Sequence, residues 1–146
     1  MCLIVDANVA KEVFSDTEES DFVELRKALL SKSPIVGVVY GGLLREELLR
    51  IAEVRRALVS LDRLGPVRQV SDAEVSQETS TVEGLALCVS NDVHIIALAR
   101  VAEVRLLCSR DQALHTDFTN AELIKSPRGE VYQNASHQHL IWQFCR

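Results

Sequence analysis

The chain has 146 residues and a formal net charge of −5, with 47% hydrophobic and 25% charged residues. That length predicts a single domain, and that composition is typical of a globular protein rather than a disordered one. No apolar run approaches the ~18 residues of a membrane span, and the first residues lack the basic start of a signal peptide. The acidic balance argues against indiscriminate binding of polyanions, but it leaves room for a nucleic-acid enzyme with an acidic metal site.

The four cysteines, Cys2, Cys88, Cys108 and Cys145, are widely spaced and form no CxxC pair. This spacing argues against a zinc knuckle and against a redox dithiol motif. We expect all four to be reduced, and we therefore expect a cytoplasmic protein.

The first half of the chain alternates between apolar runs and helical periodicity. Residues 3–5 form a short apolar run typical of a buried strand, and residues 21–30 have apolar side chains at helical spacing. Residues 35–39 are rich in β-branched side chains and predict a second strand. After Gly41-Gly42, residues 43–64 predict one long helix.

The second half continues the alternation. Its predicted elements are a strand over 67–70, helices over 72–87 and 93–104, a strand over 105–108, a short helix ending near Phe118 and a strand over 123–124. Alternating strands and helices predict an α/β fold with three α/β/α layers around a parallel sheet of four to five strands. In such sheets ligands bind beyond the carboxyl ends of the strands.

Four carboxylates fall where those strand ends should gather. Asp6 ends the first strand, Glu47 lies early in the long helix, Asp92 opens the apolar helix, and Asp111 follows the strand over 105–108. Carboxylates in one cluster repel one another unless a cation neutralises them, and all-oxygen ligands select Mg²⁺ or Mn²⁺. The sequence therefore predicts a metal site made of these side chains.

Helix register distinguishes Glu47 from its neighbour Glu46. At 100° per residue, Leu44, Leu48 and Ile51 mark the core-facing stripe, and Glu47 falls within it. Burial of a carboxylate is costly without compensation. Glu47 is therefore the predicted ligand, and Glu46 is an ordinary solvated residue.

Each acid also has a purely structural interpretation. Asp6, Asp92 and Asp111 are each suited to cap the turn or helix that follows. Glu47 is suited to pair with a nearby arginine such as Arg45 or Arg55. All four structural interpretations would have to hold at once, whereas one bound cation explains the four positions together.

The sequence resembles the PIN-domain proteins, a family of metal-dependent ribonucleases that includes many toxins of toxin–antitoxin pairs. The segments that carry the resemblance are 3–9 (LIVDANV), 41–48 (GGLLREEL), 90–99 (SNDVHIIALA) and 106–111 (LLCSRD). The resemblance implies a PIN-like nuclease domain over residues 1–125 and leaves 126–146 as a C-terminal tail. It places the family's catalytic, metal-binding acids on Asp6, Glu47, Asp92 and Asp111.

Further site residues are predicted around these acids. Asn8 and Ser109 fall where the family keeps a small polar residue that orients metal-bound water, and Asp117 is a candidate accessory acid of lower rank. Arg110, next to Asp111, is the candidate contact to RNA phosphate. His94 and His115 lie near the acids without a matched partner, and we expect both to be structural.

The implied reaction is hydrolysis of phosphodiester bonds in single-stranded RNA, assisted by one or two Mg²⁺ or Mn²⁺ ions. Aromatic residues, which grip single-stranded RNA by stacking, make up only 5% of the chain, so we expect weak base reading. Partners implied by the family are the RNA substrate and an antitoxin protein.

Three alternatives stand beside this interpretation. A phosphatase of the haloacid dehalogenase type needs an Asp at position 8, where this chain has Asn8. A phosphorylation-receiver domain needs adjacent acids and a late lysine, which Lys125 matches poorly. A catalytically silent PIN fold kept for binding or as a scaffold would be distinguished by a metal-binding measurement.

The C-terminal tail carries two local features. His137 and His139 are a weak candidate metal pair, because two histidines without further ligands are seldom a site. The apolar run 140–144 either packs on its own core or covers a partner, which would be an antitoxin or a second copy in a homodimer.

Overall fold

The computed structural model describes residues 2–15, 20–32 and 34–145. Five parallel strands form one sheet in the order β3-β2-β1-β4-β5. The strands are β1 (Leu3–Val5), β2 (Val38–Gly41), β3 (Val67–Val70), β4 (Leu106–Cys108) and β5 (Glu130–Tyr132). The predicted α/β class with a parallel sheet of four to five strands is confirmed.

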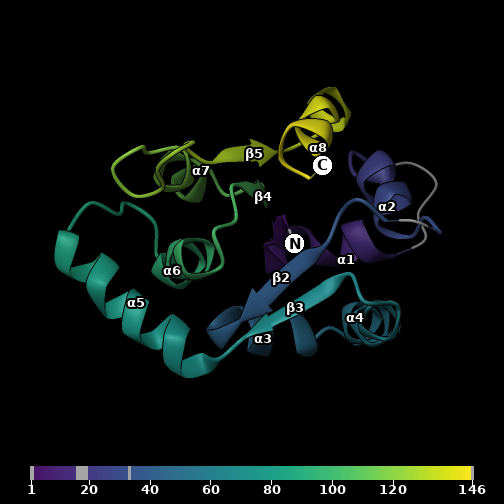
Figure 1. Ribbon diagram of the computed structural model, residues 1–146, viewed down its shortest axis with the longest axis horizontal. Coiled ribbons are helices and arrows are strands. Elements are labelled where there is room, and N and C mark those ends of the chain that lie inside the picture. The colour runs from purple at the N-terminus through teal and green to yellow at the C-terminus, as the bar shows by residue number, and fades with distance from the viewer. Residues whose placement is uncertain (1, 16–19, 33, 146) are drawn as a thin grey trace.

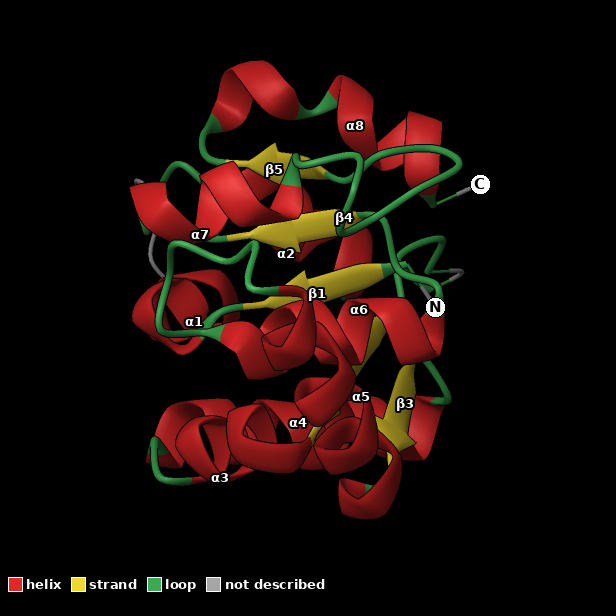
Figure 2. Cartoon of the chain, turned by 90° about the vertical axis from the view of Figure 1, so that its left-hand side faces the viewer, coloured by secondary structure: helices red, strands yellow, loops and turns green. Residues whose placement is uncertain are grey.

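Helices cover both faces of this sheet and complete a three-layer α/β/α fold. They are α1 (Ala7–Phe14), α2 (Val23–Leu29), α3 (Gly42–Leu49), α4 (Ala52–Leu64), α5 (Asp72–Leu85), α6 (Val93–Ala102), α7 (Gln112–Phe118) and α8 (His139–Phe144), with a 3-10 turn over Ala135–His137. Figure 1 shows α5 and α6 on the left of the sheet and α1, α2 and α4 on its right. Figure 2 is viewed from the side of α5 and α6 and shows β5, β4 and β1 one below the other, above these two helices in the picture.

The sheet has a topological switch point between β1 and β4. The chain adds β2 and β3 on one side of β1 and then returns to place β4 on the other side. Leu3 pairs with Leu106 and Val5 with Cys108, so β1 and β4 end level with each other. Open parallel sheets bind ligands in the crevice that such a reversal leaves beyond the strand ends.

The core is built from the apolar runs that the sequence contains. All residues of β1 and β4 are buried, as are seven of the ten residues of α6. A helix that is apolar nearly all round can lie only inside the protein, and α6 does so between α5 and the sheet. It thereby fixes the position of Asp92, which precedes its first residue.

Two glycines determine how α3 leaves the sheet. A Cβ on Gly41 would lie 2.5 Å from the Val70 carbonyl oxygen, and Gly42 has φ +58° with Val75 packed against it. Only glycine fits such close approach and a left-handed backbone without strain. The pair lets α3 begin directly at the end of β2, which places Glu47 near the strand ends.

The helix predicted over 43–64 is two helices. Ile51 takes an extended conformation (φ −93°, ψ 112°) between α3 and α4. The Leu49 carbonyl accepts a hydrogen bond of 2.9 Å from the Arg55 guanidinium. Apolar periodicity continues across the break, so the periodicity alone could not reveal it.

Other element predictions need correction. Residues 123–124 lie in a turn, and the last strand is β5, within the segment predicted as a tail. The second strand begins three residues later than predicted, and α1, directly after Asp6, was not predicted. The segment 126–146 therefore supplies an edge strand of the sheet.

The expectation that all four cysteines are reduced is wrong for two of them. Cys2 and Cys145 form a disulfide across 143 positions of sequence, with their Cα atoms 5.2 Å apart, while Cys88 and Cys108 are free. Wide sequence spacing says nothing about distance once folding brings the residue after α8 next to the residue before β1. Leu140 and Ile141 of α8 are buried, which explains how the disulfide partners meet.

Among the residues described, no helix combines the length and apolar character needed to cross a membrane.

Candidate metal centre

Four elements bring the predicted acids to the carboxyl end of the sheet. Asp6 follows β1, Asp111 follows β4, Asp92 precedes α6, and Glu47 lies in the second turn of α3. Asp92 interacts electrostatically with the other three acids, and Asp6 interacts with Glu47 and Asp111 as well. The structure therefore gathers these four side chains around the switch point.

Asp6 is the most buried of the four, with 6% of its surface exposed. Its backbone N–H donates to the Cys108 carbonyl at 2.9 Å, and its Oδ2 accepts a hydrogen bond of 2.8 Å from Ser109. Burial raises the pKa of Asp6, and the negative charges of Glu47 and Asp111 raise it further, against the lowering effect of the Ser109 hydrogen bond. The folded chain thus holds an ionised Asp6 at a cost.

Ser109 connects the ends of the two central strands. It is fully buried, and its Oγ donates to Asp6 while accepting the Asp111 backbone N–H at 3.1 Å. Its carbonyl oxygen lies 2.6 Å from His115 Nε2. Ser109 therefore orients Asp6 and the turn that carries Asp111, which differs from the water-orienting role implied by the resemblance.

Glu47 meets a partner that the sequence did not suggest. Its Oε1 lies 3.0 Å from His94 Nε2, and its side chain is 40% exposed. Glu46 is exposed on the neighbouring position of α3. Glu47 is thus less exposed than Glu46 but is not buried in the core as the helix register predicted, and its partner is a histidine rather than Arg45 or Arg55.

Asp92 and Asp111 both precede helices but use their side chains differently. Asp111 caps α7 by accepting the Leu114 N–H at 3.2 Å, whereas Asp92 makes no capping bond to α6. Burial raises the pKa of Asp92, and the charge of Asp6 adds to this effect while His94 opposes it. Capping accounts for Asp111 but not for Asp92.

The donor set suits a hard divalent cation, since it consists of carboxylates from four elements. In the described parts of the chain, however, no three His, Cys, Asp or Glu side chains stand close enough together to hold a metal ion. His94 holds one oxygen of Glu47, Ser109 holds one of Asp6, and Leu114 holds one of Asp111. Coordination by these residues requires side-chain rotation toward a common point.

Asp117 lies apart from the four acids and supports one of them indirectly. It is 1% exposed, and its two oxygens accept the backbone N–H groups of Val89 and Ser90, both at 2.9 Å. Ser90 Oγ in turn accepts the Asp92 N–H at 3.3 Å. Asp117 is therefore placed to fix the loop that carries Asp92.

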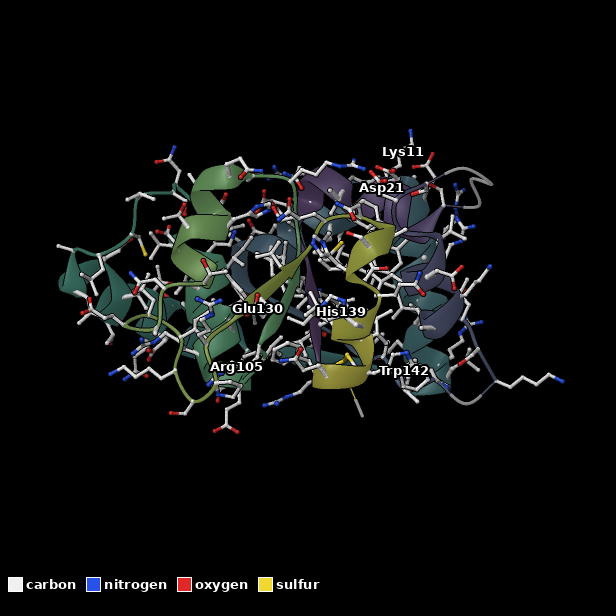
Figure 3. The ribbon with its side chains drawn as sticks, turned by 90° about the horizontal axis from the view of Figure 1, so that it is seen from above. Lys11, Asp21, Arg105, Glu130, His139 and Trp142 are labelled. Carbon is white, nitrogen blue, oxygen red and sulfur yellow. A yellow bond between two sulfur atoms is a disulfide. The ribbon has the colours of Figure 1, made fainter. Side chains whose placement is uncertain are left out.

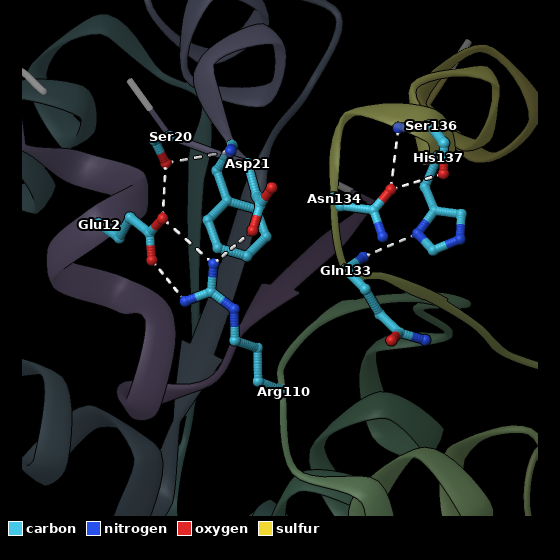
Figure 4. Close-up of polar contacts among 9 residues, drawn as sticks. Glu12, Ser20, Asp21, Arg110, Gln133, Asn134, Ser136 and His137 are labelled. Atoms are coloured by element: carbon cyan, nitrogen blue, oxygen red, sulfur yellow. Dashed lines mark hydrogen bonds and ion pairs between the residues drawn. The ribbon is translucent and has the colours of Figure 1, made fainter. Parts of the chain in front are cut away.

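Arg110 and Asn8 lie at the rim. The Arg110 guanidinium pairs with Glu12 and Asp21, with its Nη2 2.8 Å from Asp21 Oδ2, and it stacks 4.9 Å from the Phe22 ring centroid. Figure 4 shows the contacts of Arg110 with Glu12 and Asp21. Carboxylates thus already occupy the donors that were predicted for RNA phosphate. Asn8 is exposed in the first turn of α1.

Sequence reasoning set aside two histidines that the structure connects to the acids. His94 is two residues beyond Asp92 and contacts Glu47, and His115 is four residues beyond Asp111 and contacts Ser109. Both are buried. The sequence did contain one signal for His115: it lies four residues after Asp111, and residues four apart lie on one face of a helix.

His137 and His139 of the tail do not form a metal pair with a third donor in the described residues. His137 Nδ1 instead lies 3.0 Å from the Gln133 backbone nitrogen and accepts its hydrogen.

Comparison of the chain with known protein families, with curated proteins and with solved structures finds no match.

Proposed function

We propose that this chain is a PIN-like, Mg²⁺- or Mn²⁺-dependent endoribonuclease that hydrolyses single-stranded RNA. The observation that carries the proposal is the meeting of four acids, from four separate elements, at the switch point of a parallel sheet. Ligand sites in such sheets form at this position. Burial of mutually repelling carboxylates calls for a compensating cation.

The proposed chemistry uses no nucleophilic side chain. Asp6, Glu47, Asp92 and Asp111 would hold the ion, which when bound lowers the pKa of a water molecule and offsets negative charge on the phosphate. Asp92 is the best placed general base, because among the described contacts its carboxylate makes no hydrogen bond. Ser109 and His94 keep Asp6 and Glu47 in position.

A second candidate is a catalytically silent PIN fold that serves for binding or as a scaffold. It is favoured by the absence, within the described residues, of three donors already close enough to hold a metal ion. The two candidates differ in whether Mn²⁺ binds and supports hydrolysis.

The test is cleavage of a fluorescent single-stranded RNA with Mn²⁺, with Mg²⁺ and with excess EDTA. We expect cleavage with either metal and none with EDTA. Glu47→Gln should abolish cleavage, while its matched control Glu46→Gln, on the exposed neighbouring position, should retain most of it. Cleavage that survives exhaustive chelation, or equal behaviour of the two variants, would contradict the proposed centre.

The same proposal includes a protein partner. An antitoxin, or a second copy of this chain, would cover the exposed side chain of Trp142. Leu140 and Ile141 pack into the core, whereas Trp142 on the same helix (Figure 3) is 61% exposed and Ile35 beside it is 40% exposed. Because Cys145 and the buried residues belong to the core, Trp142→Ser is a better test than truncation. Light scattering should show loss of any dimer in that variant.

A cytoplasmic location is part of the same proposal, and the only argument for it is the proposed RNA substrate. The Cys2–Cys145 disulfide removes the argument from reduced cysteines, because disulfides are rare in the cytosol.

A further inference from the structure

A polar hollow of about 640 Å³ adjoins the candidate metal centre on its β5 side. It is lined by Asp21, Arg110, Gln112, Gln133, Asn134 and Ser136. Figure 4 shows Arg110 with its acidic partners on one side and Gln133 and Asn134 on the other. Three of its six polar lining residues carry side-chain amides.

The residues that line the hollow are neighbours of the candidate metal ligands, both along the chain and across the sheet. Arg110 and Gln112 flank Asp111 directly. Tyr132 pairs with Cys108 in the sheet, so Gln133 follows β5 at the level where Ser109 follows β4. Gln133 therefore lies one strand away from Asp111, which follows β4, and two strands away from Asp6, which follows β1.

Most amide groups of the hollow are accessible and are not engaged by another described protein group: Gln112 is exposed, and Gln133 and Asn134 are partly exposed. Throughout the described residues, the side-chain amides of Gln112 and Gln133 make no hydrogen bond. The Asn134 Oδ1 accepts from the Ser136 N–H at 3.0 Å and from its hydroxyl at 2.5 Å, which leaves the Asn134 amide nitrogen as a donor. The hollow thus offers both donors and acceptors.

Charge argues against phosphate as the group bound here. Glu12 and Asp21 neutralise Arg110, and Asp21 itself lines the hollow. Phe22 covers one face of the guanidinium, while the side chain remains 43% exposed. A neutral, flat ligand with several hydrogen-bonding groups fits this lining better than an anion.

We propose that this hollow binds one nucleobase of the RNA strand next to the cleaved bond, an inference that rests on the proposed ribonuclease function. The base stacks on the exposed face of the Arg110 guanidinium, as unstacked RNA bases do on arginine planes. Its edge pairs with the amides of Gln112 and Gln133. An amide pairs in bidentate fashion with adenine, so adenine is the preferred base.

If the hollow binds a base, the chain recognises RNA bases more strongly than its sequence composition predicted. That expectation came from the low aromatic content, but amides and a neutralised arginine recognise a base without an aromatic ring. Gln133, Asn134 and Ser136 come from the segment after β5, which the sequence pattern had assigned to a tail apart from the site.

The experiment compares cleavage positions in a randomised single-stranded RNA for the wild type and for Gln112→Ala/Gln133→Ala. The matched control is Gln69→Ala/Gln143→Ala, two exposed amides that do not line the hollow. Equal melting temperatures establish that all three proteins are folded. We expect an adenine preference of about tenfold next to the cleaved bond in the wild type and the control, since one good bidentate pair is worth ~1–3 kcal/mol.

In the Gln112→Ala/Gln133→Ala variant, metal-dependent cleavage should persist with this preference lost. Cleavage with no base preference in the wild type, or with the same preference in the variant, would overturn the base-binding inference alone. Absence of metal-dependent cleavage in the wild type would instead overturn the ribonuclease proposal.

Discussion

His94 and Glu47 meet across two helices, with 3.0 Å between Nε2 and Oε1. His94 is buried in α6, whereas Glu47 projects from α3 and stays partly exposed. The contact ties a partly exposed acid of α3 to the buried helix α6. It makes His94 a positioning residue for a proposed metal ligand.

The first prediction concerns that contact. His94→Ala should raise the Kd for Mn²⁺ about 10–100-fold, because loss of a ligand's supporting hydrogen bond has an effect of that size. His94→Gln, which keeps a donor, should recover part of the affinity. Isothermal titration with Mn²⁺ measures both. The exposed His139→Ala serves as control, and an unchanged Kd in His94→Ala would remove His94 from this role.

The second prediction contrasts two buried aspartates. Asp6→Asn removes a charge that burial and neighbouring acids disfavour, yet keeps an acceptor for Ser109. If about 1 kcal/mol is relieved, the metal-free melting temperature should rise by roughly 2–4 °C. The same variant should lose most of the stabilisation that Mn²⁺ gives the wild type.

Asp117→Asn, in contrast to Asp6→Asn, should lower the melting temperature of the metal-free protein. Asp117 accepts two backbone N–H groups, and an asparagine can accept only through its single oxygen, so one buried donor loses its partner. We expect a loss of about 1–3 kcal/mol. Thermal scans with EDTA and with Mn²⁺ compare the two variants. Destabilisation by Asp6→Asn with an undiminished Mn²⁺ response would exclude Asp6 from the metal site.

A third prediction follows from Glu12. The hydrogen bond from Arg110 lowers the pKa of Glu12 below its usual 4.5. A carboxylate with a lowered folded-state pKa stabilises the fold above the unfolded-state value, and that stabilisation is lost as the pH falls through the folded-state value. The wild type should therefore lose stability below about pH 4.5.

Glu12→Gln should lack this contribution already at pH 7, by roughly 0.5–1 kcal/mol, since the pair is partly exposed and screened. Its stability should then fall less steeply in acid. Urea unfolding at several pH values below and above 4.5 measures both slopes, and parallel curves would show that the pair contributes nothing.

A fourth prediction concerns the disulfide between Cys2 and Cys145. Removing a cross-link that closes nearly the whole chain should cost about 2–5 kcal/mol, mainly by releasing the unfolded chain. Cys2→Ser should lower the melting temperature in oxidising buffer to that of the wild type in reducing buffer. Cys88→Ser, at a free cysteine, is the control. A wild type insensitive to reductant would contradict this contribution.

The sequence was sufficient for the class of fold and for the placement of the acids near one edge. The strand β1 and the helix α6 consist almost wholly of apolar residues, which are stable only in the protein interior. Their local sequence was therefore enough to predict them. Asp6 and Asp111 then followed from the rule that parallel strands end at one edge.

What the sequence could not reveal depends on contacts between distant segments. The helix break at Ile51 leaves the apolar periodicity intact. The strand β5 is as short as β1 and β4 but begins with a glutamate, so it lacks their fully apolar run, and it pairs along the edge of β4. The contacts of His94 with Glu47 and of Cys2 with Cys145 likewise arise only after packing.

The most direct test of the central claim is anomalous diffraction from crystals soaked in Mn²⁺, recorded at the manganese absorption edge. We predict an anomalous peak at the carboxyl end of β1 and β4, coordinated by oxygens of Asp6, Glu47, Asp92 and Asp111. His94 and Ser109 should remain in contact with the ligands that they orient. Saturating Mn²⁺ with no peak among these four carboxylates, or with a peak only elsewhere, would contradict the account.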